Sequence, residues 1–174
     1  QPYGLVEYAQ IKGMVPEGHP YGHSTIGSMA DLEASTMDTV RDWFRQHYGP
    51  NNAVLVLAGD VDVPTDKKLV EKNFGGIKAG PKQKALNIEV PTLAAPKSEV
   101  MQDRVATTRL YRNWTVPGID GADSVPLDVG AAVLGGLASS RLDNILVREE
   151  KLAVAVTAGY QGFAQLGGLE VTAD

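Results

Sequence analysis

Two histidines lie four positions apart in the short stretch His19-Pro20-Tyr21-Gly22-His23, and Glu17 comes just before it. On a helix, two histidines at this spacing can share a metal ion. Pro20 and Gly22 argue against a helix here, although a loop could still bring the two rings together. A structural zinc site normally has four protein ligands. His19 and His23 are therefore only weak metal candidates, and local hydrogen bonds that fix a loop are the favoured interpretation.

The remaining residues of chemical interest form no complete catalytic set. His47 lies near the C-terminal end of an expected helix, where a positive charge interacts favourably with the helix dipole. The glycine-rich stretch 135–141 lacks the Lys-Ser/Thr ending of a P-loop and the G-x-G-x-x-G spacing, so it predicts a turn between two helices, with Ser139 or Ser140 capping the second. A G-x-S-x-G nucleophile motif is absent from the sequence.

The composition is that of an ordinary globular protein. The chain has 174 residues, of which 43% are hydrophobic and 21% are charged. This length suits one domain or two small ones. The net charge of −5 argues against a nucleic-acid-binding protein, which normally carries a basic patch. No apolar stretch approaches the roughly 20 residues that span a bilayer. The absence of cysteine excludes disulfides and thiol chemistry.

The most clearly patterned block of the chain contains a helix expected over 36–48 and a strand expected over 53–58. Ser35 is the predicted N-cap of that helix, and Asp38 lies three residues further on. Gly49-Pro50 ends the helix, because proline cannot continue it. The stretch 53–58 is apolar without alternation, which indicates a strand covered on both faces.

The other expected elements complete an α+β pattern. Before the central block come a modest helix within 1–14 and a loop over 16–22. After it comes a short helix with Asp62 as its cap and Pro64 in its first turn. The later half predicts a strand that ends at Pro117, helices over 127–137 and 140–151, and two adjacent strands over 153–160 and 166–172. Between the halves, the Pro/Lys-rich stretch 81–97 is an expected linker.

Several spaced motifs closely resemble the M16 (insulinase or pitrilysin-like) zinc metallopeptidase family. Most of the chain is covered by this resemblance, and the motifs occur in the family's order. The first half carries His19-Pro20-Tyr21-Gly22, Ile26-Gly27, Asp31-Leu32, Tyr48-Gly49-Pro50-Asn51-Asn52-Ala53 and Ala58-Gly59-Asp60. The second half carries Arg112-Asn113-Trp114, Leu134-Gly135-Gly136, Ser139-Ser140-Arg141-Leu142 and Leu146-Val147-Arg148-Glu149.

The resemblance implies two incomplete α/β layer domains of the M16 type (LuxS/MPP-like metallohydrolases) joined by a linker. Residues 1–80 correspond to the C-terminal part of the first M16 domain, 81–97 to the linker, and 98–174 to the N-terminal part of the second. The chain is thus expected to be an internal fragment: Gln1 is not an initiator methionine, and the stretch 168–174 looks like a strand cut short.

M16 enzymes hold zinc with an inverted H-x-x-E-H motif and a downstream glutamate, and this motif is absent from the sequence. The resemblance places both upstream of Gln1, and Glu7 is not assigned as a ligand. The parent is therefore expected to be a zinc endopeptidase acting on peptide substrates. The fragment itself is expected to lack catalytic residues, a metal site and activity. The alternative is a catalytically silent M16 homologue that acts as a scaffold or partner subunit.

Arg148 matches an arginine that contacts the substrate backbone in the non-catalytic half of M16 enzymes. The tyrosine expected seven residues later is replaced by Ala155. This departure fits the zinc-bearing half better, and an exposed arginine in a charge cluster with Glu149, Glu150 and Lys151 is the favoured interpretation.

Partners and location follow from the same resemblance and from the missing strands. A second M16 half is a possible partner of the parent, and family analogy points to the bacterial periplasm or cytoplasm. Because each domain lacks strands, apolar faces and strand edges would be exposed. The fragment is therefore expected to self-associate, by exchanging parts between copies.

Overall fold

The computed structural model describes residues 4–174, and the chain divides into two compact units. One unit contains 4–26 together with 87–174, and the other contains 27–86. The sequence analysis expects residues 4–26 and 27–80 to belong to one domain part. In the structure, residues 4–26 group with the later half of the chain. No helix in the described part is long and apolar enough to cross a membrane.

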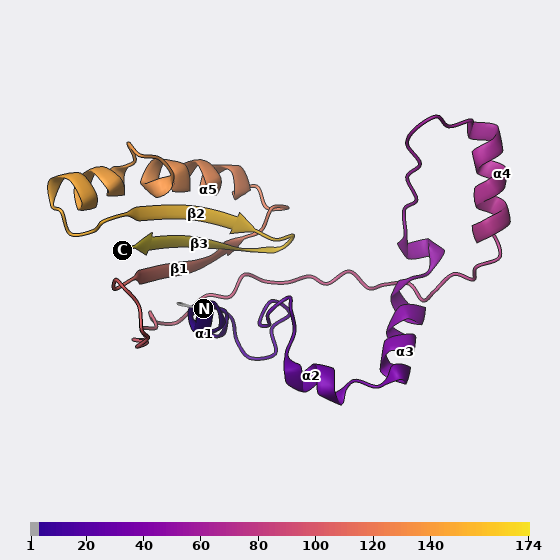
Figure 1. The fold of residues 1–174 in the computed structure, drawn as a ribbon, viewed down its shortest axis with the longest axis horizontal. Helices are drawn as coiled ribbons and strands as arrows, with labels where there is room; N and C mark the ends of the chain where they lie inside the picture. Colours follow the sequence, from indigo (N-terminus) through magenta and orange to yellow (C-terminus); the bar gives the residue numbers. More distant parts are fainter. Residues whose placement is uncertain (1–3) are drawn as a thin grey trace. The chain divides into compact units, whose positions relative to one another are not determined.

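A three-stranded antiparallel sheet forms the centre of the first unit (Figure 1). Its strands are β1 (Leu110–Pro117), β2 (Val156–Gly162) and β3 (Leu166–Ala173), in the order β1-β3-β2. The β2–β3 hairpin closes with a hydrogen bond from Phe163 N to Leu166 O of 2.9 Å. The sequence prediction that the last two strands are adjacent is confirmed.

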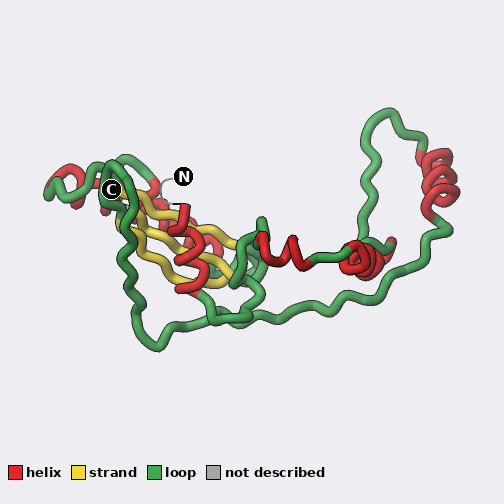
Figure 2. Tube along the Cα trace, turned by 60° about the horizontal axis from the view of Figure 1, so that its bottom comes forward, coloured by secondary structure: helices red, strands yellow, loops and turns green. Residues whose placement is uncertain are grey.

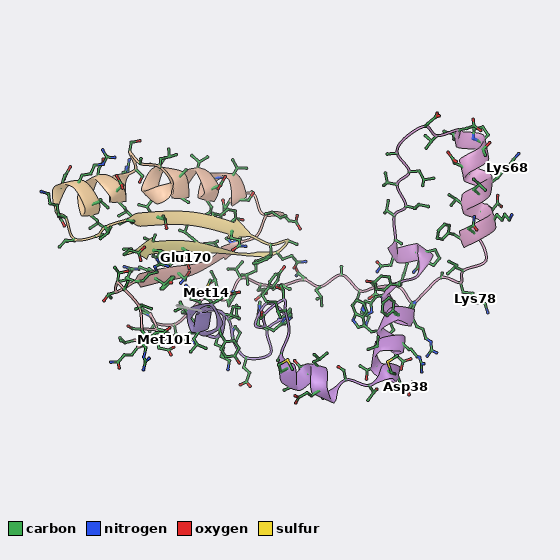
Figure 3. The ribbon with its side chains drawn as sticks, viewed as in Figure 1. Met14, Asp38, Lys68, Lys78, Met101 and Glu170 are labelled. Atoms are coloured by element: carbon green, nitrogen blue, oxygen red, sulfur yellow. The ribbon has the colours of Figure 1, made fainter. Side chains whose placement is uncertain are left out.

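Helices cover both faces of this sheet (Figure 1). Directly opposed residues of antiparallel strands point to the same face, and successive residues alternate. Leu169 of β3 shares a hollow with residues of α5 (Ser124–Ala131). Glu170 points the other way and accepts a 2.7 Å hydrogen bond from Gln10 Nε2 of α1 (Gly4–Met14). Figure 3 labels Glu170 with Met14 near it, on the α1 side of the sheet. The sheet therefore lies between α5 and α1.

Two wide helical turns, in which N–H groups bond to carbonyls five residues back, follow α5. They are η2 (Ala132–Gly136) and η3 (Asp143–Glu149), and Glu150 N donates to Ile145 O at 2.8 Å. The helices predicted over 127–137 and 140–151 are thus present, but wide turns replace most of their α-helical part after α5. Gly135 explains the close approach of η2 to the sheet, because a Cβ there would lie 2.6 Å from Ala158 N.

The second unit consists of short helices: α2 (Met29–Ala34), α3 (Met37–His47), η1 (Pro50–Asn52) and α4 (Val63–Phe74). Asp62 caps α4 as predicted, accepting a hydrogen bond from Thr65 N. The predicted cap of α3 was wrong by one residue. Thr36 is the N-cap and accepts from Thr39 N, whereas the Ser35 hydroxyl donates to Asp31 O at the end of α2, a helix the sequence analysis did not predict.

The strand predicted over 53–58 does not form. Residues 53–58 belong to no helix or strand, and no described segment of the second unit pairs with them. A strand is stable only when a neighbouring strand accepts and donates its backbone hydrogen bonds. The apolar composition of the stretch is real, but its pairing partner is not present among residues 27–86.

Most of the apolar side chains of the described chain are exposed. The buried hydrophobic side chains are Val15, Ala131, Val156, Ala158 and Leu166, all of the first unit. A long stretch without helix or strand runs from the end of α4 to the start of β1 (Figure 2). Its part from residue 87 on belongs to the first unit, where Thr115 Oγ1 donates to Pro91 O at 2.6 Å and Ile88 N donates to Gln165 Oε1 at 2.7 Å.

Candidate functional site

The stretch around His19 and His23 is a loop whose polar groups are used locally. Tyr21 N donates to His19 Nδ1 at 3.2 Å, and Gly22 N donates to His19 O at 2.7 Å. Tyr21 also reaches the β2–β3 hairpin, where its hydroxyl accepts from Gln165 N at 3.3 Å and its ring lies 5.8 Å from that of Phe163. These contacts agree with the prediction that the histidines fix a loop.

Both histidines of this loop use their Nδ1 atoms in local contacts. The Nδ1 atom of His23 lies 3.1 Å from its neighbour's carbonyl, Ser24 O, and the side chain of His19 is engaged with Tyr21. Within residues 4–174, no three His, Cys, Asp or Glu side chains are grouped so that they could hold a metal ion. A catalytic zinc site has three protein ligands and an open position for water.

His47 lies at the end of α3 against an aromatic neighbour. Its Nδ1 lies 2.9 Å from Trp43 O, and its ring stacks on that of Trp43 with centroids 4.6 Å apart. On the same side of the helix, the rings of Phe44 and Tyr48 are 4.5 Å apart. The predicted interaction with the helix dipole stays a prediction, since the observed role of His47 is packing and one carbonyl contact.

Arg148 of η3 contacts the preceding turn over 135–141. Its guanidinium bonds to Asp143 Oδ2 at 2.9 Å and also donates to Ala138 O. The side chain is 59% exposed, as predicted, and its observed partners are Asp143 of η3 and Ala138 of the turn, in place of the neighbouring charges. Ser140 begins the helical segment and is only 4% exposed, yet its hydroxyl has no partner in the described chain, so it is not the side-chain cap predicted from the sequence.

Two hollows open on apolar surfaces, one in each unit, and the sequence analysis missed both. The first, of about 340 Å³, lies between α5 and Leu169 of β3, and its lining includes one charged residue, Asp123. The second, of about 390 Å³, lies between α4 and the extended stretch that contains Leu55 and Leu57. Sequence periodicity indicates which side chains are apolar, but a hollow depends on which elements pack beside them.

An ion pair joins the start of β1 to the end of β3. Arg109 precedes β1, and its Nη2 donates to Asp174 Oδ2 at 3.0 Å, beside a second bond from Nε to Oδ1. The hydrogen bond to Asp174 is the main cause that raises the pKa of Arg109, and Tyr111 adds to it. This contact fixes the ends of β1 and β3 together and has a structural role.

The fold and these local contacts define an α+β protein whose described part carries no metal-binding group. The chain belongs to the M16 peptidase family: residues 35–174 match the family described as "Peptidase M16 inactive domain". The family resemblance seen in the sequence motifs is thereby confirmed.

Several known proteins are similar to this chain. The zinc protease PqqE of Helicobacter pylori is 30% identical over 141 residues, which cover 78% of this chain and 31% of that protein. The crystal structure of a protease from Helicobacter pylori has a TM-score of 0.61 at 27% identity and covers 89% of this chain and 38% of its own. The peptidase M16 inactive domain from Pseudomonas fluorescens matches in fold, with a TM-score of 0.72 at 21% identity over 97% of this chain and 40% of its own. The chain thus spans about a third of the length of the curated relative.

Proposed function

We propose that this chain is the non-catalytic middle part of an M16 zinc endopeptidase. In this proposal the chain forms part of the wall that holds the peptide substrate, and the zinc-binding residues belong to another part of the parent protein. The observation that carries it is the match of residues 35–174 to the M16 inactive domain, together with relatives that are named zinc proteases. Residues 1–80 and 98–174 are then parts of successive M16 domains, joined by the linker 81–97.

The experiment that tests this proposal starts from the gene. Sequencing the coding region upstream of Gln1 is expected to reveal an H-x-x-E-H motif followed by a glutamate. The encoded longer protein is then expected to contain zinc by elemental analysis and to hydrolyse peptides, with activity lost on chelation. A longer protein with an intact motif that neither binds zinc nor cleaves peptides would contradict the proposal.

The alternative is a catalytically silent subunit that supports a partner M16 chain. One observation favours it: the matching family is described as an inactive domain. A degraded upstream motif would select this alternative. In either case a second M16 half is the proposed partner of the parent.

Self-association of the 174-residue chain belongs to the same proposal. It is supported by the many large apolar side chains that are exposed to solvent in both units. Size-exclusion chromatography with light scattering is expected to give a mass of at least two chains, and a monomer at micromolar concentration would contradict this part alone.

A further inference from the structure

We propose that the stretch 82–85 is a processing site for a trypsin-like endopeptidase, and that the chain cut there stays together as a two-chain protein. The stretch offers two bonds, Lys82–Gln83 and Lys84–Ala85. Hydrolysis of the second consumes one water molecule and leaves a carboxylate on Lys84 and an amino group on Ala85. This inference goes beyond the proposed function and does not depend on the peptidase assignment.

The stretch lies between two residues that are held by side chains. Before it, Gly80 is bonded through its N–H and its C=O to the side chain of Asn51. After it, Ile88 N donates to Gln165 Oε1 at 2.7 Å. Between these points, the backbone of 82–85 belongs to no helix or strand and makes no hydrogen bond within the described chain. A protease can therefore bind this backbone without first unfolding an element.

The side chains of the stretch suit an enzyme that selects basic residues. Lys82 and Lys84 are both exposed, and neither is followed by proline. A trypsin-like endopeptidase takes such a side chain into a pocket that carries a carboxylate. The sequence has no Asp or Glu from 72 to 88, so no neighbouring carboxylate competes for the lysine charges.

Most other basic residues lie where the backbone is already bonded. An endopeptidase binds its substrate in an extended conformation, so a helix or strand must open locally before it is cut. The basic residues within helical segments or strands are Lys12, Arg41, Arg45, Lys67, Lys68, Lys72, Arg112, Arg141 and Arg148.

The basic residues outside these elements are less suitable than Lys84. Arg109 is paired with Asp174, and Lys151 is followed by Leu152, whose N–H donates to Leu146 O at 2.8 Å. Lys78 comes two residues before Gly80, which Asn51 holds. Lys97 and Arg104 lie in an irregular stretch, but acidic residues are close to them in sequence, at positions 99 and 103.

The order of the units along the chain explains why a cut here does not release a piece. The first unit is formed by two parts of the chain, 4–26 and 87–174, and the second unit, 27–86, is inserted between them. A cut at 82–85 breaks one of the two covalent connections between the units. The two parts of the first unit then belong to different chains, and only their contacts hold them together.

These contacts join α1 and the loop after it to the sheet. Gln10 Nε2 donates to Glu170 Oε2 at 2.7 Å, and the Tyr21 hydroxyl accepts from Gln165 N at 3.3 Å. Val15, between them in sequence, is only 7% exposed. Figure 3 shows α1 beside the sheet on the side of Glu170. The pieces 4–84 and 85–174 therefore share one packed unit after the cut.

Limited trypsin digestion of the 174-residue chain tests the site. Mass spectrometry is expected to locate the first cut within 82–85. Lys82→Gln/Lys84→Gln is expected to slow the first cut at least about tenfold, because the next sites need local opening or lie near acidic residues. Lys97→Gln is the matched control and is expected to leave the rate unchanged, since Lys97 is exposed and outside helices and strands. A first cut outside 82–85 would overturn the proposed site.

Retention of the two pieces tests the two-chain form. With an affinity tag at the N-terminus, the piece that begins at residue 85 is expected to stay bound to the tagged piece after cutting. Gln10→Ala/Tyr21→Phe removes two hydrogen bonds between the pieces and is expected to weaken this retention about tenfold.

Tyr48→Phe/Asn73→Ala is the control, because both residues lie in the second unit. It is expected to retain the piece as the wild type does. Release of the untagged piece from the cut wild type, or equal retention by both double variants, would overturn the two-chain form. Neither outcome bears on the peptidase proposal, which the upstream motif and zinc content test.

Discussion

The side-chain amide of Asn51 makes two hydrogen bonds with the backbone of Gly80, 29 residues further along the chain. Asn51 Nδ2 donates to Gly80 O at 3.0 Å, and Gly80 N donates to Asn51 Oδ1 at 2.8 Å. Gly49 lies against the same backbone, and a Cβ at Gly49 would come within 2.5 Å of Gly80 N. The Gly-Pro-Asn-Asn sequence after α3 therefore holds the segment that follows α4.

Replacing Asn51 is expected to weaken the attachment of Gly80 to the stretch that follows α3. Asn51→Ala removes both hydrogen bonds and is expected to lower the free energy of unfolding by about 0.5–1.5 kcal/mol. Urea unfolding followed by Trp43 fluorescence measures the change, with Trp114→Phe in the background to remove the other tryptophan. Asn73→Ala is the control, because Asn73 Nδ2 bonds only within α4, to Leu69 O, and alanine favours the helix. Equal stability of both variants would contradict a stabilising role for Asn51.

A methyl group at Gly135 is expected to disturb the packing of η2 on the sheet. Its Cβ would lie 2.6 Å from Ala158 N and 2.8 Å from Ala158 Cβ, so Gly135→Ala forces η2 away from β2. Overpacking of this kind costs about 1–3 kcal/mol. Thermal unfolding measures the loss.

Gly130→Ala is the matched control for this prediction. Gly130 lies in α5, and a Cβ there meets nothing within 4 Å. Alanine is the better helix former by up to about 1 kcal/mol, so Gly130→Ala should be neutral or stabilising. A stable Gly135→Ala variant would show that η2 does not pack on β2 in solution.

The hydroxyl of Tyr160 joins the two outer strands of the sheet. It donates to Pro117 O at 2.9 Å, so the side chain crosses over β3, where Gly167 leaves room for the ring. Tyr160→Phe is expected to cost about 0.5–1.5 kcal/mol of unfolding free energy through loss of this bond alone.

Tyr48→Phe is the control for this change, because Tyr48 is largely exposed and its contacts are with aromatic rings. It is expected to change the free energy of unfolding by less than about 0.5 kcal/mol. The double variant Tyr160→Phe/Gly167→Ala is expected to lose less than the sum of the two single losses, because a Cβ at Gly167 displaces the Tyr160 ring and already weakens its hydroxyl bond to Pro117 O. Simple additivity would count against the crossing.

Zinc binding by the 174-residue chain is expected to be weak and independent of the two loop histidines. The ring of His19 accepts from Tyr21 N, and the described chain has no group of three ligands. Calorimetric titration with zinc should therefore give the same result for the wild type and for His19→Ala/His23→Ala. Stoichiometric uptake that the double variant loses would establish a metal site and reverse this assignment.

Local sequence signals determined several elements and the family of this protein. Asp62 and Pro64 predict the start of α4, and Gly49-Pro50 predicts the end of α3, because capping and the missing proline N–H act within one turn of helix. The stretches 153–160 and 166–172 predict β2 and β3, which pair through a short hairpin. The spaced motifs also identify the M16 family, because each motif is a short run of residues that can be recognised without knowledge of the tertiary structure.

Tertiary structure alone decided what depends on neighbours distant in the sequence. Residues 53–58 have the composition of a buried strand but no partner within their unit, so backbone pairing and not composition determined their state. Ser35 and Thr36 are both good caps, and the formation of α2 immediately before them engaged Ser35 with Asp31. The contact of residues 4–26 with the later half, and the placement of α1 and α5 on opposite sheet faces, depend on long-range burial, which sequence periodicity does not specify.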